Sequence, residues 1–189
     1  MPTLGEQLRE DWVAHDRRLD RPGLHAVAVH RLGTWGREQP LPLRLLVRAL
    51  YNVLYLFVRN VYGIEIPISV PLGRRVRILH QSGIVCQGGA VIGDDCELRQ
   101  NVTLGSYTEG PNGRQGAPTL QAGVSVGAGA SIIGDVTIGE GARIGANATV
   151  LTDVPPGATA FARPAQILRP ASARPAEADA TAADAAGRG

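Results

Sequence analysis

The sequence predicts a mainly β protein, a parallel β-helix preceded by a short N-terminal helical segment. Three observations predict this fold: a six-residue aliphatic period, 24 glycines with only 4% aromatic residues, and a change of pattern near residue 63. An α-helix repeats its faces every 3.6 residues and a strand every two, so neither explains a period of six. Stacked coils of short strands do, because each coil buries its apolar edge against the next.

The period is regular enough to be followed residue by residue between positions 63 and 168. The aliphatic positions of the second half are Leu120, Val126, Ile132, Ile138, Ile144 and Val150. Those of the first half are Leu72, Ile78 and Ile84 and, after a slip of two residues, Ile92, Leu98 and Leu104. Glycine follows at Gly73, Gly93, Gly105, Gly127, Gly139 and Gly145. We expect these glycines to serve turns whose backbone conformation a Cβ would penalise.

Residues 1–62 read as a helical segment. Thr3 and Glu6 have the form of a capping box. A second helix is expected from Leu24 to Trp35, and a third from Leu43 to Tyr62. The apolar faces are wide enough to require packing on each other or on a neighbouring subunit.

The longest apolar stretch lies within residues 41–62, where polar residues interrupt it: Arg44, Arg48, Asn52 and Arg59. A membrane span needs about 20 mainly apolar residues. We therefore expect a helix that packs on protein, and no membrane partner. The N-terminus has no basic and apolar leader, so a cytoplasmic protein is expected.

Two further segments break the repeat. Residues 106–118 are too long and polar for a turn between coils, so we expect an external loop within the β-helix domain of residues 63–168. Residues 169–189 are rich in alanine and are expected to be a disordered tail.

Composition excludes several functions. A formal net charge of +2 and few aromatic residues disfavour nucleic-acid binding. All 19 basic residues are arginine, which excludes a lysine Schiff base and a phosphate-loop lysine. Cys86 and Cys96 fit neither a disulfide framework nor a zinc module. We expect no metal site and no permanently bound cofactor.

Four stretches carry a family resemblance: residues 63–67, 79–85, 101–105 and 126–130. In order and content they resemble the serine O-acetyltransferases of the hexapeptide-repeat acyltransferases. The resemblance implies a left-handed β-helix and a homotrimer with active sites between subunits. It also implies acyl transfer from acetyl-CoA, or another acyl thioester, to a small-molecule hydroxyl. The family's helical domain is longer than residues 1–62, so a lone trimer is expected.

A hydroxyl nucleophile needs a general base at neutral pH, and histidine has a suitable pKa. His80 is the histidine of the repeat region, whereas His15, His25 and His30 lie in the helical segment. The resemblance makes His80 the catalytic base. Glu65 stands where the family carries an aspartate, nearly one coil earlier, and would orient the imidazole.

The expected acceptor site departs from the family. Leu79 replaces an aspartate, and Gly116 and Ala117 replace an Arg-His pair, while Arg114 could still supply a positive charge. The donor site is better matched. Small residues at Ala128, Gly129 and Ala146 would let pantetheine lie along the coils, and Arg143 and Arg163 are candidates for the nucleotide phosphates.

The leading interpretation is an O-acyltransferase acting on L-serine or a serine-like acceptor. Its rivals are an acyltransferase of a sugar or specialised-metabolite hydroxyl, and one whose donor is bound to an acyl carrier protein. A β-helix carbonic anhydrase would need three metal-binding histidines in the coils. The repeat region has one histidine, His80, which argues against this class. A non-enzymatic scaffold is the remaining class. Cys86 in an aliphatic repeat is expected to be a small buried side chain and not a nucleophile.

Overall fold

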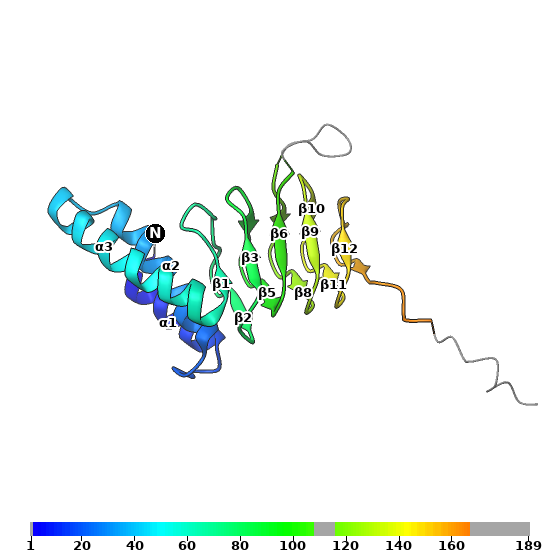
Figure 1. Ribbon diagram of the computed structural model, residues 1–189, viewed down its shortest axis with the longest axis horizontal. Helices are drawn as coiled ribbons and strands as arrows, with labels where there is room; N and C mark the ends of the chain where they lie inside the picture. Colours follow the sequence, from blue (N-terminus) through cyan, green and yellow to red (C-terminus); the bar gives the residue numbers. More distant parts are fainter. Residues whose placement is uncertain (1, 108–115, 167–189) are drawn as a thin grey trace, which may run out of the picture.

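The computed structural model describes residues 2–107 and 116–166, and it shows helices at one end of a stack of parallel strands (Figure 1). The helices are α1 (Leu4–Ala14), α2 (Pro22–Arg37) and α3 (Leu41–Phe57), and a π-helical turn, η1 (Val58–Tyr62), extends α3. The predicted capping box is confirmed, because the Thr3 hydroxyl accepts from the Glu6 amide and Glu6 accepts from the Thr3 amide. The third helix begins two residues earlier than predicted, with Pro42 in its first turn.

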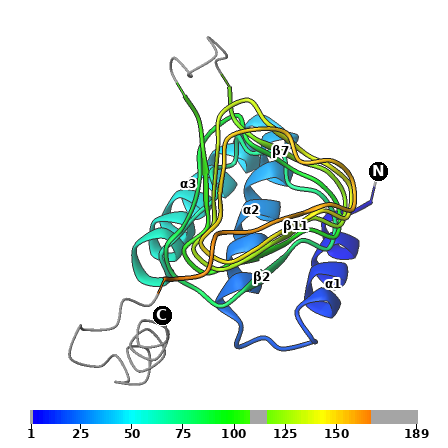
Figure 2. The same cartoon turned by 90° about the vertical axis from the view of Figure 1, so that its right-hand side faces the viewer.

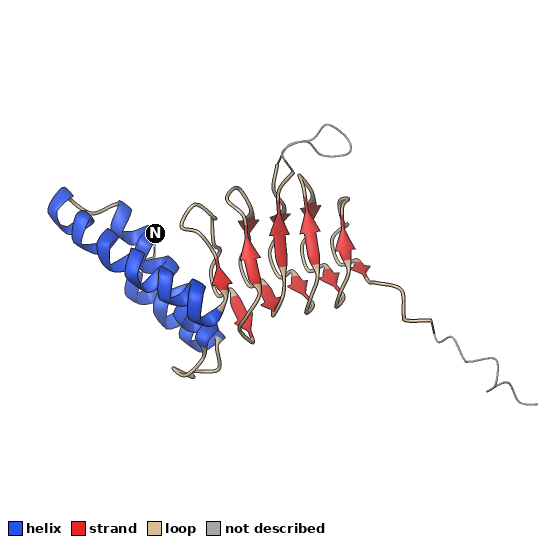
Figure 3. Cartoon of the chain, viewed as in Figure 1, coloured by secondary structure: helices blue, strands red, loops and turns tan. Residues whose placement is uncertain are grey.

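The strands form the three sides of a left-handed parallel β-helix (Figures 2 and 3). Sheet A contains β1 (Ile64–Glu65), β3 (Ile84–Cys86), β6 (Thr103–Gly105), β9 (Ser131–Ile133) and β12 (Thr149–Val150). Sheet B contains β4 (Val91–Ile92), β7 (Thr119–Leu120) and β10 (Thr137–Ile138). Sheet C contains β2 (Arg77–Leu79), β5 (Glu97–Arg99), β8 (Ser125–Val126), β11 (Arg143–Ile144) and β13 (Thr159–Ala160).

The residues at the six-residue period form the core of this prism. The periodic residues point inward and are almost completely buried; those with no exposed surface include Ile84, Leu98, Leu104, Val126, Ile132 and Ile138. The registers of the parallel pairs bring them directly above one another, as Leu104 pairs with Ile132 and Ile132 with Val150. Each coil therefore supplies one aliphatic layer to a continuous column.

The reason given for the glycines after the periodic positions was wrong. None of these six has a positive φ. A Cβ added to Gly73 would instead lie 2.3 Å from the backbone carbon of Gly93, and one added to Gly127 would lie 2.6 Å from the Ala146 nitrogen. Gly93, Gly139 and Gly145 are also crowded by the next coil, whereas a Cβ on Gly105 would make an ordinary contact at 3.6 Å. All of these glycines but Gly105 therefore allow neighbouring coils to approach closely. The left-handed positions lie elsewhere in the turns, for example at Asn101 and Asn147.

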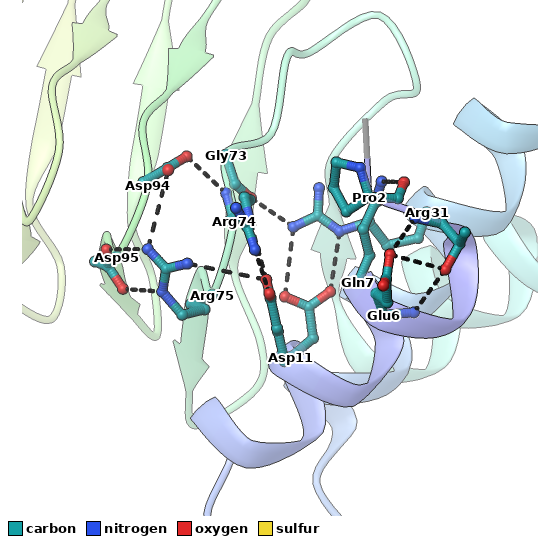
Figure 4. A network of polar contacts seen from close by, with 12 residues as sticks. Pro2, Glu6, Gln7, Asp11, Arg31, Gly73, Arg74, Arg75, Asp94 and Asp95 are labelled. Carbon is teal, nitrogen blue, oxygen red and sulfur yellow. Dashed lines mark hydrogen bonds and ion pairs between the residues drawn. The ribbon is translucent and has the colours of Figure 1, made fainter.

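Polar side chains fasten the helices to the first coil. Arg31 and Asp11 form a buried ion pair of 2.9 Å (Figure 4). Arg31 also donates to the carbonyl of Leu72 at 2.7 Å. His15 donates through Nδ1 to the Asp11 carbonyl and accepts at Nε2 from the Ile78 amide. This network, which a fold built on aliphatic periods did not predict, fixes the helices against β2.

α3 packs on α2 through one face only. Val47, Tyr51 and Val58 are buried there. The opposite face is apolar and exposed, with Leu46 at 68% and Val53 at 66% of full exposure. By length and composition the continuous helix Leu41–Tyr62 could cross a membrane. The predicted tail of residues 169–189 and the tip of the predicted loop, residues 108–115, lie outside the described part of the chain.

Candidate functional site

The candidate site begins at one edge of the prism, where sheet C turns into sheet A. We call this edge the His80 corner; it comprises residues 80–83, 100–102, 127–130 and 145–148. Backbone hydrogen bonds join the turns from coil to coil: the Asn101 amide donates to Ser82, Gly129 to Gln100, and Asn147 to Ala128, at 2.8–3.0 Å. The edge is thus a continuous rail that runs from His80 along the stack.

His80 itself is exposed and has an unusual backbone conformation. Its φ is 64°, and Ser82 two residues later has a φ of 90°. Left-handed conformations at non-glycine residues carry a free-energy cost and are concentrated at active sites and ligand contacts. The turn therefore displays an imidazole at the surface of the prism, and the next coil holds this turn through the hydrogen bond from the Asn101 amide to the Ser82 carbonyl.

Glu65 lies on β1, directly beneath the coil that contains His80. It pairs with Val85, and the neighbouring Gly63 is tightly packed against Ser82 and Gly83. The structure shows no hydrogen bond between Glu65 and His80. The negative charge of Glu65 instead acts on Tyr55: burial chiefly, and this charge in addition, raise the pKa of Tyr55 to about 12. Glu65 is thus near His80 in the stack without a hydrogen bond to its imidazole.

The residues expected around the acceptor separate into two places. Leu79 ends β2 beside His80 and is half-buried. Ala117 lies at the other end of sheet A, at the corner between sheets A and B, where its Cβ is 3.6 Å from the position that a Cβ on Gly89 would occupy. One chain therefore does not bring Leu79 and Ala117 together. Arg114 lies outside the described residues.

The residues expected for the donor gather on the same rail as His80. Ala128 and Gly129 lie in its third turn and Ala146 in its fourth, all at least partly exposed. Arg143 is exposed on β11, the strand that enters the fourth turn, and Arg163 follows β13. Ala128, Gly129 and Ala146 have small side chains or none, and the two arginines lie towards the far end of the rail.

Two asparagines that the sequence interpretation overlooked shape this rail. The Asn101 Oδ1 lies 2.1 Å from where a Cβ on Gly83 would be, and the Asn147 Oδ1 lies 2.2 Å from the same position on Gly129. Each asparagine follows its glycine by one coil, about eighteen residues. That repeated offset between glycine and asparagine is the signal that could have identified them.

Cys86 is buried, as expected, and takes no part in this surface. Burial in the aliphatic core, followed by the charge of Glu65, raises the pKa of its thiol to about 12. The thiolate is the nucleophilic form of cysteine, so this side chain stays protonated and inert at neutral pH.

Comparisons with known proteins agree with this geometry. The family model "Bacterial transferase hexapeptide (six repeats)" matches residues 117–152. A serine acetyltransferase of Mycobacterium tuberculosis is 39% identical over 147 residues, which cover 78% of this chain and 61% of that relative. The chain therefore spans about three fifths of the length of this curated relative.

Two solved structures match as well. Soybean serine acetyltransferase complexed with serine has a TM-score of 0.71 and 31% identity, covering 89% of this chain and 70% of that one. Serine acetyltransferase from Brucella abortus strain S19, in complex with coenzyme A, has a TM-score of 0.68 and 27% identity. That match covers 87% of this chain and 67% of the Brucella chain.

Proposed function

Because the chain belongs to the serine acetyltransferase family, we propose that it is an O-acyltransferase that moves the acetyl group of acetyl-CoA to the hydroxyl of L-serine or a serine-like acceptor. The observation that carries this proposal is the rail: an exposed imidazole in a strained turn, followed on the same edge by small residues in the third and fourth turns. An imidazole and a thioester lying along one open edge are the two requirements of direct acyl transfer.

In the proposed reaction His80 acts as general base. Its imidazole accepts the hydroxyl proton while the acceptor oxygen attacks the thioester carbonyl carbon. The tetrahedral intermediate then collapses with cleavage of the C–S bond, and the imidazolium returns the proton to the leaving thiolate. Glu65 would stabilise the imidazolium after a small adjustment of its side chain, because it lies on the adjacent coil near the same corner.

The donor would lie along the rail. Ala128, Gly129 and Ala146 would accommodate pantetheine, and Arg143 and Arg163 would neutralise the phosphates of the nucleotide. Resident metals or prosthetic groups are not part of the proposed reaction, which needs only the two substrates.

We also infer a homotrimer with active sites between subunits. Leu79 and His80 lie at the corner between sheets C and A, and Ala117 lies at the corner between sheets A and B. A site that uses both therefore requires the corner of one subunit to face the loop of its neighbour. Light scattering after gel filtration is expected to give three times the chain mass. The proposed compartment is the cytoplasm.

The test is a steady-state assay of thiol release from acetyl-CoA with L-serine. His80→Ala should lower kcat by about 10²–10⁴-fold, whereas His25→Ala, at a half-buried position in α2, should leave it within about twofold. Glu65→Gln should lower kcat with little change in KM. Absence of turnover with L-serine in the parent protein, or full activity of His80→Ala, would refute the proposal.

A further inference from the structure

The end of β5 places an arginine beside the His80 corner that has no role in the proposed reaction. Arg99 pairs in register with Leu79, the residue directly before His80. Paired residues of neighbouring strands lie about 4.8 Å apart and point to the same face of the sheet. Both residues follow buried ones, Leu98 and Ile78, so both side chains face outward. A guanidinium therefore lies one coil along the stack from the residue next to the proposed base.

Arg99 shares its carboxylate partner with a second arginine. Its Nε and Nη2 donate to Oε1 of Glu97 at 3.3 and 2.9 Å, and Arg77 approaches Oε2 of the same carboxylate at 3.6 Å. A second carboxylate, that of Asp16, lies 3.8 Å from Arg77. The Arg99 side chain is 48% exposed, and its Nη1 makes no hydrogen bond within residues 2–107 and 116–166. The guanidinium is thus held on one edge and keeps donors for an anion.

The charges of this corner suit the carboxylate of an acceptor better than an ammonium. Strands β1, β2, β3, β5 and β6 surround its first two turns, and they carry two carboxylates, Glu65 and Glu97. Glu65 is assigned to the imidazole in the proposed reaction, and Glu97 holds two arginines. The outward position next to His80 is Leu79, whose side chain offers an ammonium nothing in place of its lost water. These strands therefore present a positive group to the acceptor and no unassigned negative one.

Position along the stack assigns Arg99 to the acceptor and not to the donor. It precedes the second turn of the rail, whereas Ala128 and Ala146, proposed for the pantetheine, lie in the third and fourth. Arg143, proposed for the phosphates, lies two coils beyond Arg99. The thioester end of the donor would therefore be nearest to Arg99. A thioester carries no formal charge, so the anion that Arg99 can bind at this place belongs to the acceptor.

We propose that Arg99 binds the carboxylate of the acceptor and that the preferred acceptor is a hydroxy acid without an ammonium group. This inference rests on the proposed acyl transfer at His80. The acceptor hydroxyl would lie at the imidazole, its carboxylate on the open edge of Arg99, and its carbon chain against Leu79. Arg99 is then a specificity-determining residue, because it selects the acceptor by charge.

Three alcohols that differ in one charged group test this assignment. They are L-serine, 3-hydroxypropanoate, which lacks the ammonium, and ethanolamine, which lacks the carboxylate. Thiol release from acetyl-CoA by the full chain gives kcat/KM for each. The value for 3-hydroxypropanoate should exceed that for L-serine, and it should exceed that for ethanolamine about 100-fold, since ethanolamine leaves the guanidinium without an anion.

A variant of Arg99 identifies the group that is recognised. Arg99→Gln should lower kcat/KM for 3-hydroxypropanoate about 10- to 100-fold, through KM, and should leave ethanolamine and the KM for acetyl-CoA within about threefold. The control Arg75→Gln removes the same charge from the turn before β2, where Arg75 pairs with Asp95, and should change each value less than about twofold. An equal loss with all three acceptors, or a higher KM for acetyl-CoA alone, would overturn the proposal.

A second variant supplies the carboxylate that the corner lacks. Leu79→Asp should make L-serine a better substrate than 3-hydroxypropanoate, whereas Leu79→Asn, which adds polarity without charge, should leave 3-hydroxypropanoate the better of the two. A parent protein with a higher kcat/KM for L-serine than for 3-hydroxypropanoate would overturn the assignment of Arg99 and leave the proposed function intact. No thiol release with any of the three alcohols would overturn both.

Discussion

The two parts of the molecule place their polar and apolar residues in opposite ways. In the β-helix, large aliphatic side chains fill the interior and short polar side chains face outward, as Leu104 and Thr103 illustrate on adjacent positions of β6. In the helical segment, Asp11 and Arg31 are buried while Leu46 and Val53 are exposed. The β-helix buries its own apolar side chains by stacking one coil on the next. The helices are attached through buried polar contacts, and one face of α3 is apolar and exposed in the single chain.

The largest effect on stability is expected at the buried ion pair. Asp11→Ala would leave the Arg31 guanidinium buried without its carboxylate, which should cost about 3–5 kcal/mol of unfolding free energy. Urea denaturation followed by circular dichroism measures it. The control is Arg18→Ala, which removes an ion pair to Asp20 whose side chains are more than half exposed and should cost less than about 1 kcal/mol. Similar values for both variants would show that the helices are not attached in this way.

The next effect contrasts an inward with an outward aliphatic residue. Ile132→Ala should destabilise the β-helix by about 2–5 kcal/mol, because Ile132 is fully buried between Leu104 and Val150. Leu46→Ala, on the exposed face of α3, should change the free energy of unfolding by less than about 0.5 kcal/mol. A cost for Leu46→Ala as large as that for Ile132→Ala would mean that α3 is already buried against another copy of the chain.

A pH dependence should also arise from the helical segment. Burial lowers the pKa of His30 from 6.5 to about 4, and its Nε2 donates to the Val70 carbonyl at 2.9 Å. The unfolded chain therefore takes up a proton at higher pH than the folded one. Stability that is complete above about pH 6.5 should decline as the pH falls, by about 3 kcal/mol at pH 4.

His30→Gln keeps a hydrogen-bond donor and removes this proton uptake. Its unfolding free energy should depend less on pH between 6.5 and 4 than that of the parent protein. Burial also lowers the pKa of His15, so part of the slope should remain. An identical slope in both proteins would contradict the assignment to His30.

The β-helix was predictable from sequence, because each coil repeats a local rule. One aliphatic residue per six positions specifies an inward side chain whatever the rest of the chain does, and Ile132 and Leu104 follow it. The reason for a glycine at position 73 could not be predicted from the sequence. Crowding by the next coil depends on the distance between backbones and not on the residue's own φ.

The attachment of the helices could not be predicted in the same way. Asp11, Arg31 and Leu72 are far apart in the sequence, and no period connects them. Within the site, the family motifs identified His80, and the structure located it on a rail with Ala128 and Ala146. The separation of Leu79 from Ala117 follows only from the three-sided cross-section.

The most direct measurement is a crystal structure of the full chain with coenzyme A bound. We expect the pantetheine to lie along Ala128, Gly129 and Ala146, with its sulfur directed towards His80. Coenzyme A bound instead in the cavity between α2 and α3, with its phosphates on Arg44 and Arg48, would contradict the assignment of the donor site to the His80 corner.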